Sequence, residues 1–259
     1  MEYLTSNYSL SLVALSYVIA SIASYTALDL AGRIRQTEGK SRFAWLAIGS
    51  VAMGVGVWSM HFIGMLAFKL SFPVAYDPLI TVASSFAGIF AAAVALSTIS
   101  GKKLGVIRLL LAGIVMGAGI VVMHYSGMYA MEMPAHTSYD PLLFSISVGI
   151  AIAASIAAMV IAFQLSNQWA IQRGGVFLFA LRFIAALIMG VAVCGMHYTG
   201  MAAASFTPSN EVFMVSGVDS WLLGFSVAVS TFVVLFTALM SSVVSHNFGS
   251  SIAFDNAGD

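Results

Sequence analysis

The sequence MGVAVCGMHYTGM at residues 189–201 has two close copies earlier in the chain, MGVGVWSMHFIGM at 53–65 and MGAGIVVMHYSGM at 116–128. Each copy contains three methionines, one histidine and three glycines, within a segment that is otherwise almost wholly apolar. Residues three, four or seven positions apart share a face of a helix, so the histidine and methionines of one copy occupy a single arc. The copies therefore predict three helices that present the same Met/His face.

The whole chain is far more apolar than a soluble domain. Of its 259 residues, 60% are hydrophobic and 8% are charged, whereas soluble domains carry about 25% charged residues. A bilayer core takes about 20 apolar residues per helix, and seven segments meet that requirement: 8–30, 43–68, 78–99, 108–131, 141–165, 176–204 and 221–243. We therefore predict an all-α polytopic membrane protein of seven transmembrane helices. The net charge of zero argues against nucleic acid as a partner.

The three motif helices are expected to belong to an internal repeat. Each unit holds a motif helix, a short acidic loop and a returning helix, so three two-helix units and one leading helix account for the seven spans. The returning helices follow Asp77, Asp140 and Asp219, and the first two of these precede a proline. We expect these aspartates to cap their helices. Because the motif helices run in one direction, their histidines should lie at one depth, about 10 Å from the helix ends.

Basic residues predict the orientation in the membrane. Nine of them follow the first, third or fifth span, and only Lys69 lies on the other side. We therefore expect the N-terminus outside, the C-terminus in the cytoplasm, and the histidines near the outer face. Residues 1–244 are interpreted as the membrane domain and 245–259 as a short cytoplasmic tail, the start of a linker to an output domain. Asp29 is the one acid expected within a span.

Thioether and imidazole groups form a soft donor set that suits Cu(I) better than magnesium, calcium or manganese. Zinc could use the imidazoles, but thioethers are not among its usual ligands. The predicted ligands are the histidines and the flanking methionines: His61, His124, His197, Met60, Met65, Met123, Met128, Met196 and Met201. Further candidates are Met53, Met116, Met189 and Cys194. The common catalytic motifs are absent from the sequence, so we expect no enzyme activity from this chain.

The strings Met60-His61-Phe62-Ile63, Met123-His124-Tyr125-Ser126 and Met196-His197-Tyr198-Thr199 resemble the MHYT family of bacterial integral membrane sensor domains. Only the third string spells the motif in full, so the three positions need not be equivalent. The resemblance implies a copper-binding sensor of a diatomic gas (oxygen, carbon monoxide or nitric oxide) in the bacterial inner membrane. It also implies a cytoplasmic output that makes or degrades cyclic di-GMP, or a histidine kinase.

Three other functions remain open at the level of sequence. A copper or small-solute transporter or channel could use the same Met/His face, although its ligands should then extend along the whole bilayer depth. The motifs instead cluster in the predicted outer half, apart from Met53, Met116 and Met189. A haem-binding sensor could use two of the histidines as axial ligands. The chain could also be a purely structural anchor.

Overall fold

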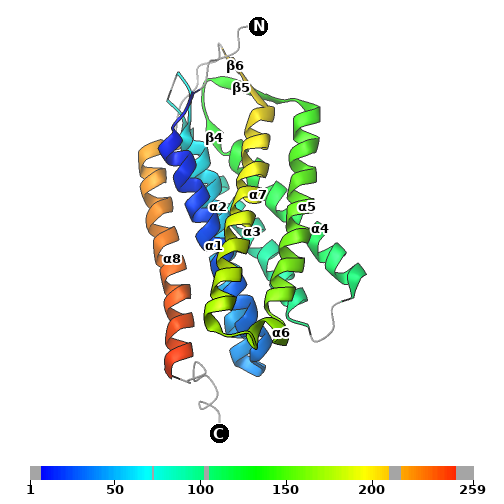
Figure 1. Ribbon diagram of the computed structural model, residues 1–259. Helices are drawn as coiled ribbons and strands as arrows, with labels where there is room; N and C mark the ends of the chain where they lie inside the picture. The colour runs from blue at the N-terminus through cyan, green and yellow to red at the C-terminus, as the bar shows by residue number, and fades with distance from the viewer. Residues whose placement is uncertain (1–6, 72, 102–104, 210–216, 249–259) are drawn as a thin grey trace.

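The computed structural model describes residues 7–71, 73–101, 105–209 and 217–248 (Figure 1). Seven helices of this part are long and apolar enough to cross a membrane, which confirms the predicted fold class. They are α1 (Leu10–Gln36), α2 (Gly39–Ala67), α3 (Pro78–Ile99), α4 (Val106–Tyr129), α5 (Pro141–Leu165), α7 (Gly175–Ala203) and α8 (Ser220–Phe248). The short helix α6 (Gln168–Ile171) connects α5 to α7.

The observed helix ends differ from the predicted spans mainly where charged residues follow the apolar segment. The first helix continues to Gln36 instead of residue 30, and the second begins at Gly39 instead of 43. Backbone hydrogen bonding does not stop where hydrophobicity does, so these helices extend past the apolar stretch. The last helix likewise passes residue 244 and reaches Phe248. The rest of the predicted tail lies outside the described residues, as do Lys102, Lys103 and Glu211.

Within the described residues, seven short strands, none of them predicted from the sequence, lie at the end of the bundle where the motif helices finish (Figure 1). They are β1 (Asn7–Tyr8), β2 (Phe68–Lys69), β3 (Ala75–Tyr76), β4 (Met131–Glu132), β5 (Ala135–Tyr139), β6 (Ala204–Pro208) and β7 (Val218–Asp219). They pair antiparallel as β1–β2, β4–β3–β7 and β5–β6. These small sheets connect the three motif loops, and they hold the ends of the motif helices together.

The predicted aspartate caps are confirmed. The side chain of Asp77 accepts a hydrogen bond from the backbone N–H of Ile80 at 2.8 Å, and that of Asp140 accepts one from Leu143 at 2.9 Å. Asp219 accepts from two backbone N–H groups in the first turn of α8, at 2.9 and 3.0 Å. These bonds satisfy N–H groups that have no partner within the helix. The aspartates therefore start the returning helices and are not oriented toward the histidines.

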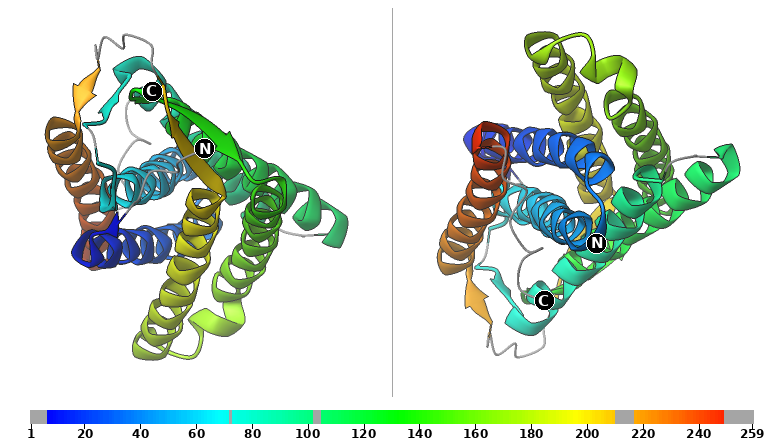
Figure 2. Two further views of the ribbon diagram at one scale, coloured as in Figure 1. Left: turned by 90° about the horizontal axis from the view of Figure 1, so that it is seen from above. Right: turned by 90° about the horizontal axis from the view of Figure 1, so that it is seen from below.

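Six helices form a closed ring in the order α1, α2, α3, α4, α5, α7 and back to α1 (Figure 2). Motif helices thus alternate with plain helices around the ring. The last helix, α8, lies outside the ring and packs against α2 and α1. In the sequence repeat α8 is the returning helix of the third unit, but the leading helix α1 takes the corresponding place in the ring.

The packing register shows that α1 is equivalent to α3 and α5. On each plain helix, the residue twelve positions after the N-cap meets a glycine of the neighbouring motif helix, so close that an added Cβ would overlap it. The contacts are Ile89 with Gly54, Ile152 with Gly117 and Ser21 with Gly190. Glycines at these contacts let the helix backbones approach closely in a membrane. The ring therefore has an approximate threefold symmetry.

Candidate metal centre

The three motif histidines meet inside the ring. The Nδ1 atoms of His61 and His124 lie 3.0 Å apart, those of His61 and His197 3.2 Å, and those of His124 and His197 3.3 Å. The planes of the imidazoles are nearly perpendicular to one another, with interplanar angles of 77°, 84° and 87°. Each histidine is 1% exposed. The equal depth predicted from the repeat thus brings one side chain from each of α2, α4 and α7 to a single point.

Each imidazole lies against the last glycine of another motif, in a cyclic arrangement. An added Cβ on that glycine would overlap with the Nε2 atom of the ring. The pairs are His61 with Gly127, His124 with Gly200 and His197 with Gly64. Any larger residue at these glycines would displace the imidazole. The glycine of one motif helix therefore sets the position of the histidine on another motif helix.

Three neutral imidazoles at these distances cannot satisfy one another's hydrogen bonds. A neutral ring nitrogen is either an N–H donor or a lone-pair acceptor. Among three Nδ1 atoms that all contact each other, at least two must therefore be of the same kind and face one another unfavourably. A cation between them removes this conflict, because all three lone pairs can then point at it.

The triangle has nearly the dimensions of a metal site. Nitrogens bound at 2.0–2.1 Å in tetrahedral or trigonal geometry lie about 3.3 to 3.6 Å apart, within a few tenths of an ångström of the observed 3.0–3.3 Å. In the described part of the chain these histidines form the one group of at least three potential His, Cys, Asp or Glu ligands, all within 4.8 Å. The Nε2 atoms are buried and make no well-aligned hydrogen bond there. Three imidazoles suit both copper and zinc.

The methionines of the motifs form two layers along their helices, one near the depth of the triangle and one deeper. Six are buried beside the histidines or one turn from them, each at most 3% exposed: Met60, Met65, Met123, Met128, Met196 and Met201. The other three, Met53, Met116 and Met189, lie about 12 Å further along their helices and line one cavity of about 30 Å³. The structure therefore brings all three deeper methionines together, as well as the histidines.

Cys194 is not brought into this centre. Its thiol is free and half-buried on α7, and it is not a member of the three-histidine group. Although Cys194 lies three residues before His197 on the same helix, its thiol is not grouped with the three imidazoles. The structure gives no support to Cys194 as a fourth ligand.

The motif tyrosines hold the site to the surrounding plain helices. The hydroxyl of Tyr125 is hydrogen-bonded to Ser147 on α5 at 2.7 Å, and that of Tyr198 to Ser16 on α1 at 2.9 Å. Both serines lie seven positions after the N-cap of their helix. Phe62 stands at the equivalent place in the first motif. These hydrogen bonds fix the plain helices α5 and α1 against the motif helices next to the histidines.

Further aromatic rings from the strands cover the same end of the site. Tyr8 on β1 packs edge to face on Tyr198 at 5.7 Å, and Tyr139 on β5 packs on Tyr125 at 5.4 Å between ring centroids. Burial, with a smaller contribution from the neighbouring tyrosine, raises the pKa of Tyr8 and of Tyr139 to about 12. Both hydroxyls therefore stay neutral at physiological pH, and this cover adds no charge near the histidines.

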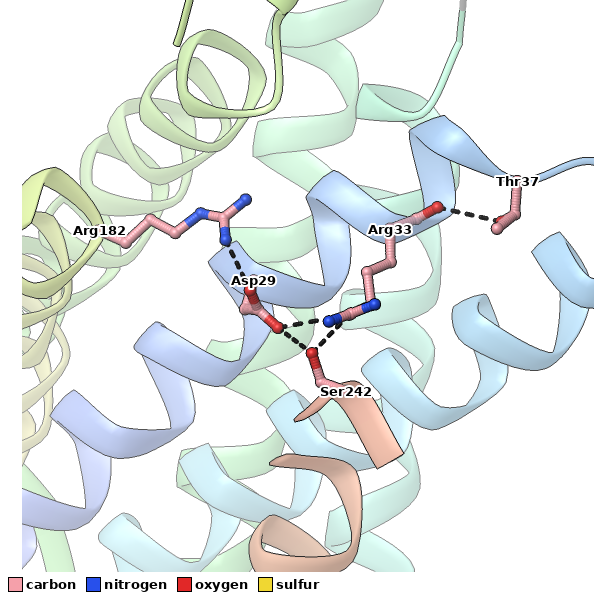
Figure 3. A network of polar contacts seen from close by, with 5 residues as sticks. All are labelled: Asp29, Arg33, Thr37, Arg182 and Ser242. Atoms are coloured by element: carbon pink, nitrogen blue, oxygen red, sulfur yellow. Dashed lines mark hydrogen bonds and ion pairs between the residues drawn. The ribbon is translucent and has the colours of Figure 1, made fainter. Parts of the chain in front are cut away.

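A polar cluster that the sequence did not predict lies at the opposite end of the bundle. Arg182, one of the nine basic residues that were used for the orientation, is buried and donates from Nη1 to Oδ1 of Asp29 at 2.6 Å. The other oxygen of Asp29 accepts from Ser242 Oγ and lies 3.6 Å from Nε of Arg33, which also donates to Ser242 at 2.5 Å (Figure 3). This cluster joins α1, α7 and α8. The one signal for this cluster in the sequence is an arginine that lies seven residues after the start of an apolar helix.

Comparison with known proteins gives a family and several relatives. The family model MHYT, described as a bacterial signalling protein N-terminal repeat, matches residues 54–112, 117–175 and 190–253. The bifunctional diguanylate cyclase/cyclic di-GMP phosphodiesterase MucR of Pseudomonas aeruginosa is 43% identical over 242 residues, covering 93% of this chain and 34% of the relative.

Two further relatives are, by their names, a signalling protein and a cyclic di-GMP phosphodiesterase. The signaling protein YkoW of Bacillus subtilis is 38% identical over 199 residues, covering 77% of this chain and 24% of the relative. The cyclic di-GMP phosphodiesterase NbdA of Pseudomonas aeruginosa is 36% identical over 219 residues, covering 84% of this chain and 27% of the relative. The chain thus spans about a third or less of the length of these relatives. No solved structure matches it.

Proposed function

The chain belongs to the MHYT family of bacterial signalling proteins, and we propose that it is a copper-binding sensor domain of the bacterial inner membrane. Its signal is a diatomic gas (oxygen, carbon monoxide or nitric oxide) or copper itself. It relays that signal to a cytoplasmic output such as cyclic di-GMP turnover, the activity that the names of two relatives state for those proteins.

The observation that carries the proposal is the triangle of His61, His124 and His197. Three buried neutral donors from three helices, with their nitrogens 3.0–3.3 Å apart, form a site that a cation would complete. The flanking methionines make the surroundings soft and apolar, which favours a monovalent ion over a divalent one. When bound, Cu(I) would supply a redox-active centre with affinity for small neutral molecules. The chain's own residues orient the imidazoles and keep the site dry.

The proposed orientation places the strands outside and the Asp29 cluster at the cytoplasmic end. The excess of basic residues at the latter end supports this placement. The triangle then lies about 10 Å from the outer helix ends, within reach of a small molecule that arrives from outside or through the bilayer.

The last helix, α8, provides the proposed route to the cytoplasm. The hydroxyl of Thr231 on α8 shares a buried hydrogen bond of 2.5 Å with that of Ser59 on α2, two residues before His61. Further along, Ser242 joins α8 to Asp29. Because α8 lies outside the ring, it can shift without opening the ring. A change in the position of His61 would therefore be passed through α2 to the helix that leaves the membrane domain.

Two alternatives are less well supported by the geometry. The cavities beside the deeper methionines measure about 30 and 20 Å³, room for about one or two water molecules, which favours a sensor over a transporter. Axial haem ligands bind on opposite faces of a porphyrin, whereas the Nδ1 atoms here are only 3.0–3.3 Å apart. That separation leaves no room for the macrocycle.

The deciding experiment is elemental analysis of protein purified from copper-supplied cells. We expect roughly one copper ion per native chain, because three imidazoles and one small ligand fill a coordination sphere. The variant with His61, His124 and His197 all replaced by alanine should hold none above background. His136→Ala is the matched control, because His136 is exposed on β5, outside the site. Native protein without metal would refute the proposal, and uptake of copper into liposomes would favour the transporter.

A further inference from the structure

A cavity of about 390 Å³ lies between α1 and α7 at the end of the bundle opposite the strands. Its polar side chains are those of Tyr25, Asp29, Arg33 and Gln36 on α1 and of Arg182 on α7, and the backbone of Gly175, the first residue of α7, also lines it. It is more than ten times larger than either cavity beside the methionines, so it can hold a small ligand group. It is also separate from the histidine triangle.

The charges around this cavity do not balance. Two guanidinium groups, those of Arg33 and Arg182, share the single carboxylate of Asp29, and both carboxylate oxygens are already engaged. Arg182 is only 9% exposed, and its Nε atom has no hydrogen-bond partner in the described part of the chain. Burying an unpaired cation within a membrane is costly. The cluster therefore carries one positive charge in excess and one unused donor that an anion would satisfy.

The start of α7 adds further donors to the same cavity. The N-cap, Gly174, has a φ of 96° and supplies no side-chain cap, so the first N–H groups of the helix have no partner from that residue. Such helix N-termini attract anions through these N–H groups and through the helix dipole. A guanidinium group and several backbone N–H groups together suit an anion with several acceptor oxygens, such as phosphate.

The depth of the cavity suits a phosphate at the membrane surface. The helices α1 and α7 have 27 and 29 residues, about 40 Å at 1.5 Å per residue, and so extend beyond a hydrocarbon core of about 30 Å. Gly175 then lies at the level of the lipid headgroups, and Arg182 about 10 Å deeper. Phe179, which also lines the cavity, is 55% exposed, so an acyl chain could pass along it.

We propose that the cavity between α1 and α7 binds a phosphate-bearing anion, held by Arg182, Arg33 and the N-terminus of α7. The anion is either the phosphate of an anionic phospholipid or a soluble phosphate. By binding to the cluster that joins α1, α7 and α8, the anion stabilises the contact between the ring and α8.

Gly32 allows Arg182 to be displaced without a change of charge. An added Cβ at Gly32 would lie 2.6 Å from Nη2 of Arg182, so Gly32→Ala pushes the guanidinium away. Arg182→Gln removes the charge itself. Asp29→Asn removes the anion that competes for Arg182. Lys40→Gln is the matched control, because Lys40 is exposed at the same end of the bundle and outside the cavity.

The test uses the purified, delipidated chain and two probes. Phosphatidylglycerol is compared with phosphatidylcholine by native mass spectrometry, and radiolabelled inorganic phosphate is measured by equilibrium dialysis. We expect saturable binding that is at least about tenfold weaker in Arg182→Gln and in Gly32→Ala, because charge-assisted hydrogen bonds are lost. Lys40→Gln should bind as the native chain does, and Asp29→Asn should bind as tightly or more tightly.

The outcomes distinguish a lipid phosphate from a soluble phosphate, and both of them from a purely structural ion pair. Retention of phosphatidylglycerol without phosphate binding identifies a lipid site, whereas phosphate binding identifies a soluble ligand. Equal binding by native chain and Arg182→Gln, equal loss in Lys40→Gln, or no binding of either probe would overturn the proposal. A purely structural ion pair predicts that Asp29→Asn and Arg182→Gln behave alike. Metal content should stay unchanged in Arg182→Gln, so this proposal and that of the copper sensor fail independently.

Discussion

Replacing Gly127 with alanine should open the histidine triangle without altering any predicted ligand. The added Cβ would overlap with Nε2 of His61 and lie 3.3 Å from Cζ of Phe62. To restore ordinary contact, the imidazole must move by about 1 Å, and protein interiors resist such shifts. Phe62 is fully buried, and its ring centroid lies 4.8 Å from that of His61, so the imidazole cannot retreat toward it.

The size of the effect follows from the cost of overpacking, about 1–3 kcal/mol. If that cost falls on the position of one ligand, affinity for Cu(I) should fall about 5- to 150-fold, since each 1.4 kcal/mol is a factor of ten. Helix propensity acts in the opposite direction, because alanine is favoured over glycine by about 1 kcal/mol. Thermal stability alone would therefore understate the damage to the site.

Gly195→Ala is the matched control. Gly195 also lies on a motif helix, two residues before His197, and an added Cβ there meets no atom within 4 Å. Both variants gain the same helix propensity, so their difference isolates the contact with the imidazole. The assay is competition for Cu(I) with a chromogenic chelator, in detergent. Equal Cu(I) affinity of Gly127→Ala and Gly195→Ala would refute the argument that the glycine positions the histidine.

Three further replacements test the contacts around the site by thermal unfolding, with metal content as the second readout. Tyr198→Phe loses the hydrogen bond to Ser16, which should cost about 0.5–1.5 kcal/mol and leave metal content unchanged; loss of metal would show a direct ligand role. Asp140→Ala removes a helix cap and should cost about 1 kcal/mol; an unchanged midpoint would contradict the cap. Thr231→Val loses the bond to Ser59, worth about 0.6 kcal/mol in a membrane, and should speed hydrogen exchange in α8. Exchange at the native rate would remove that bond from the proposed relay.

Much of the fold could be predicted because a bilayer imposes simple demands on a chain. Apolar segments of sufficient length must be helical there, since backbone groups have no other partner. The repeat then placed three histidines at one depth. Asp77 and Asp140 were predictable as caps because their chemistry is local.

Other features depend on contacts between segments that are distant in the sequence. The place of α1 in the ring could not be predicted, because its twelve-residue register toward Gly190 is visible only once the helices are packed. Arg182 resembled any other basic residue near a membrane surface, and only packing shows that it reaches Asp29 across the bundle.

Local hydrogen bonding and hydrophobicity set the number of spans, the repeat, the caps and the kind of donor atoms, so these features could be predicted from the sequence. Packing between the helices brings the three histidines into one triangle instead of separate sites, which the sequence left open. It also separated Cys194 from them and placed α8 outside the ring. These outcomes depend on which side chains fill which spaces, and the closest contacts join residues more than 60 positions apart.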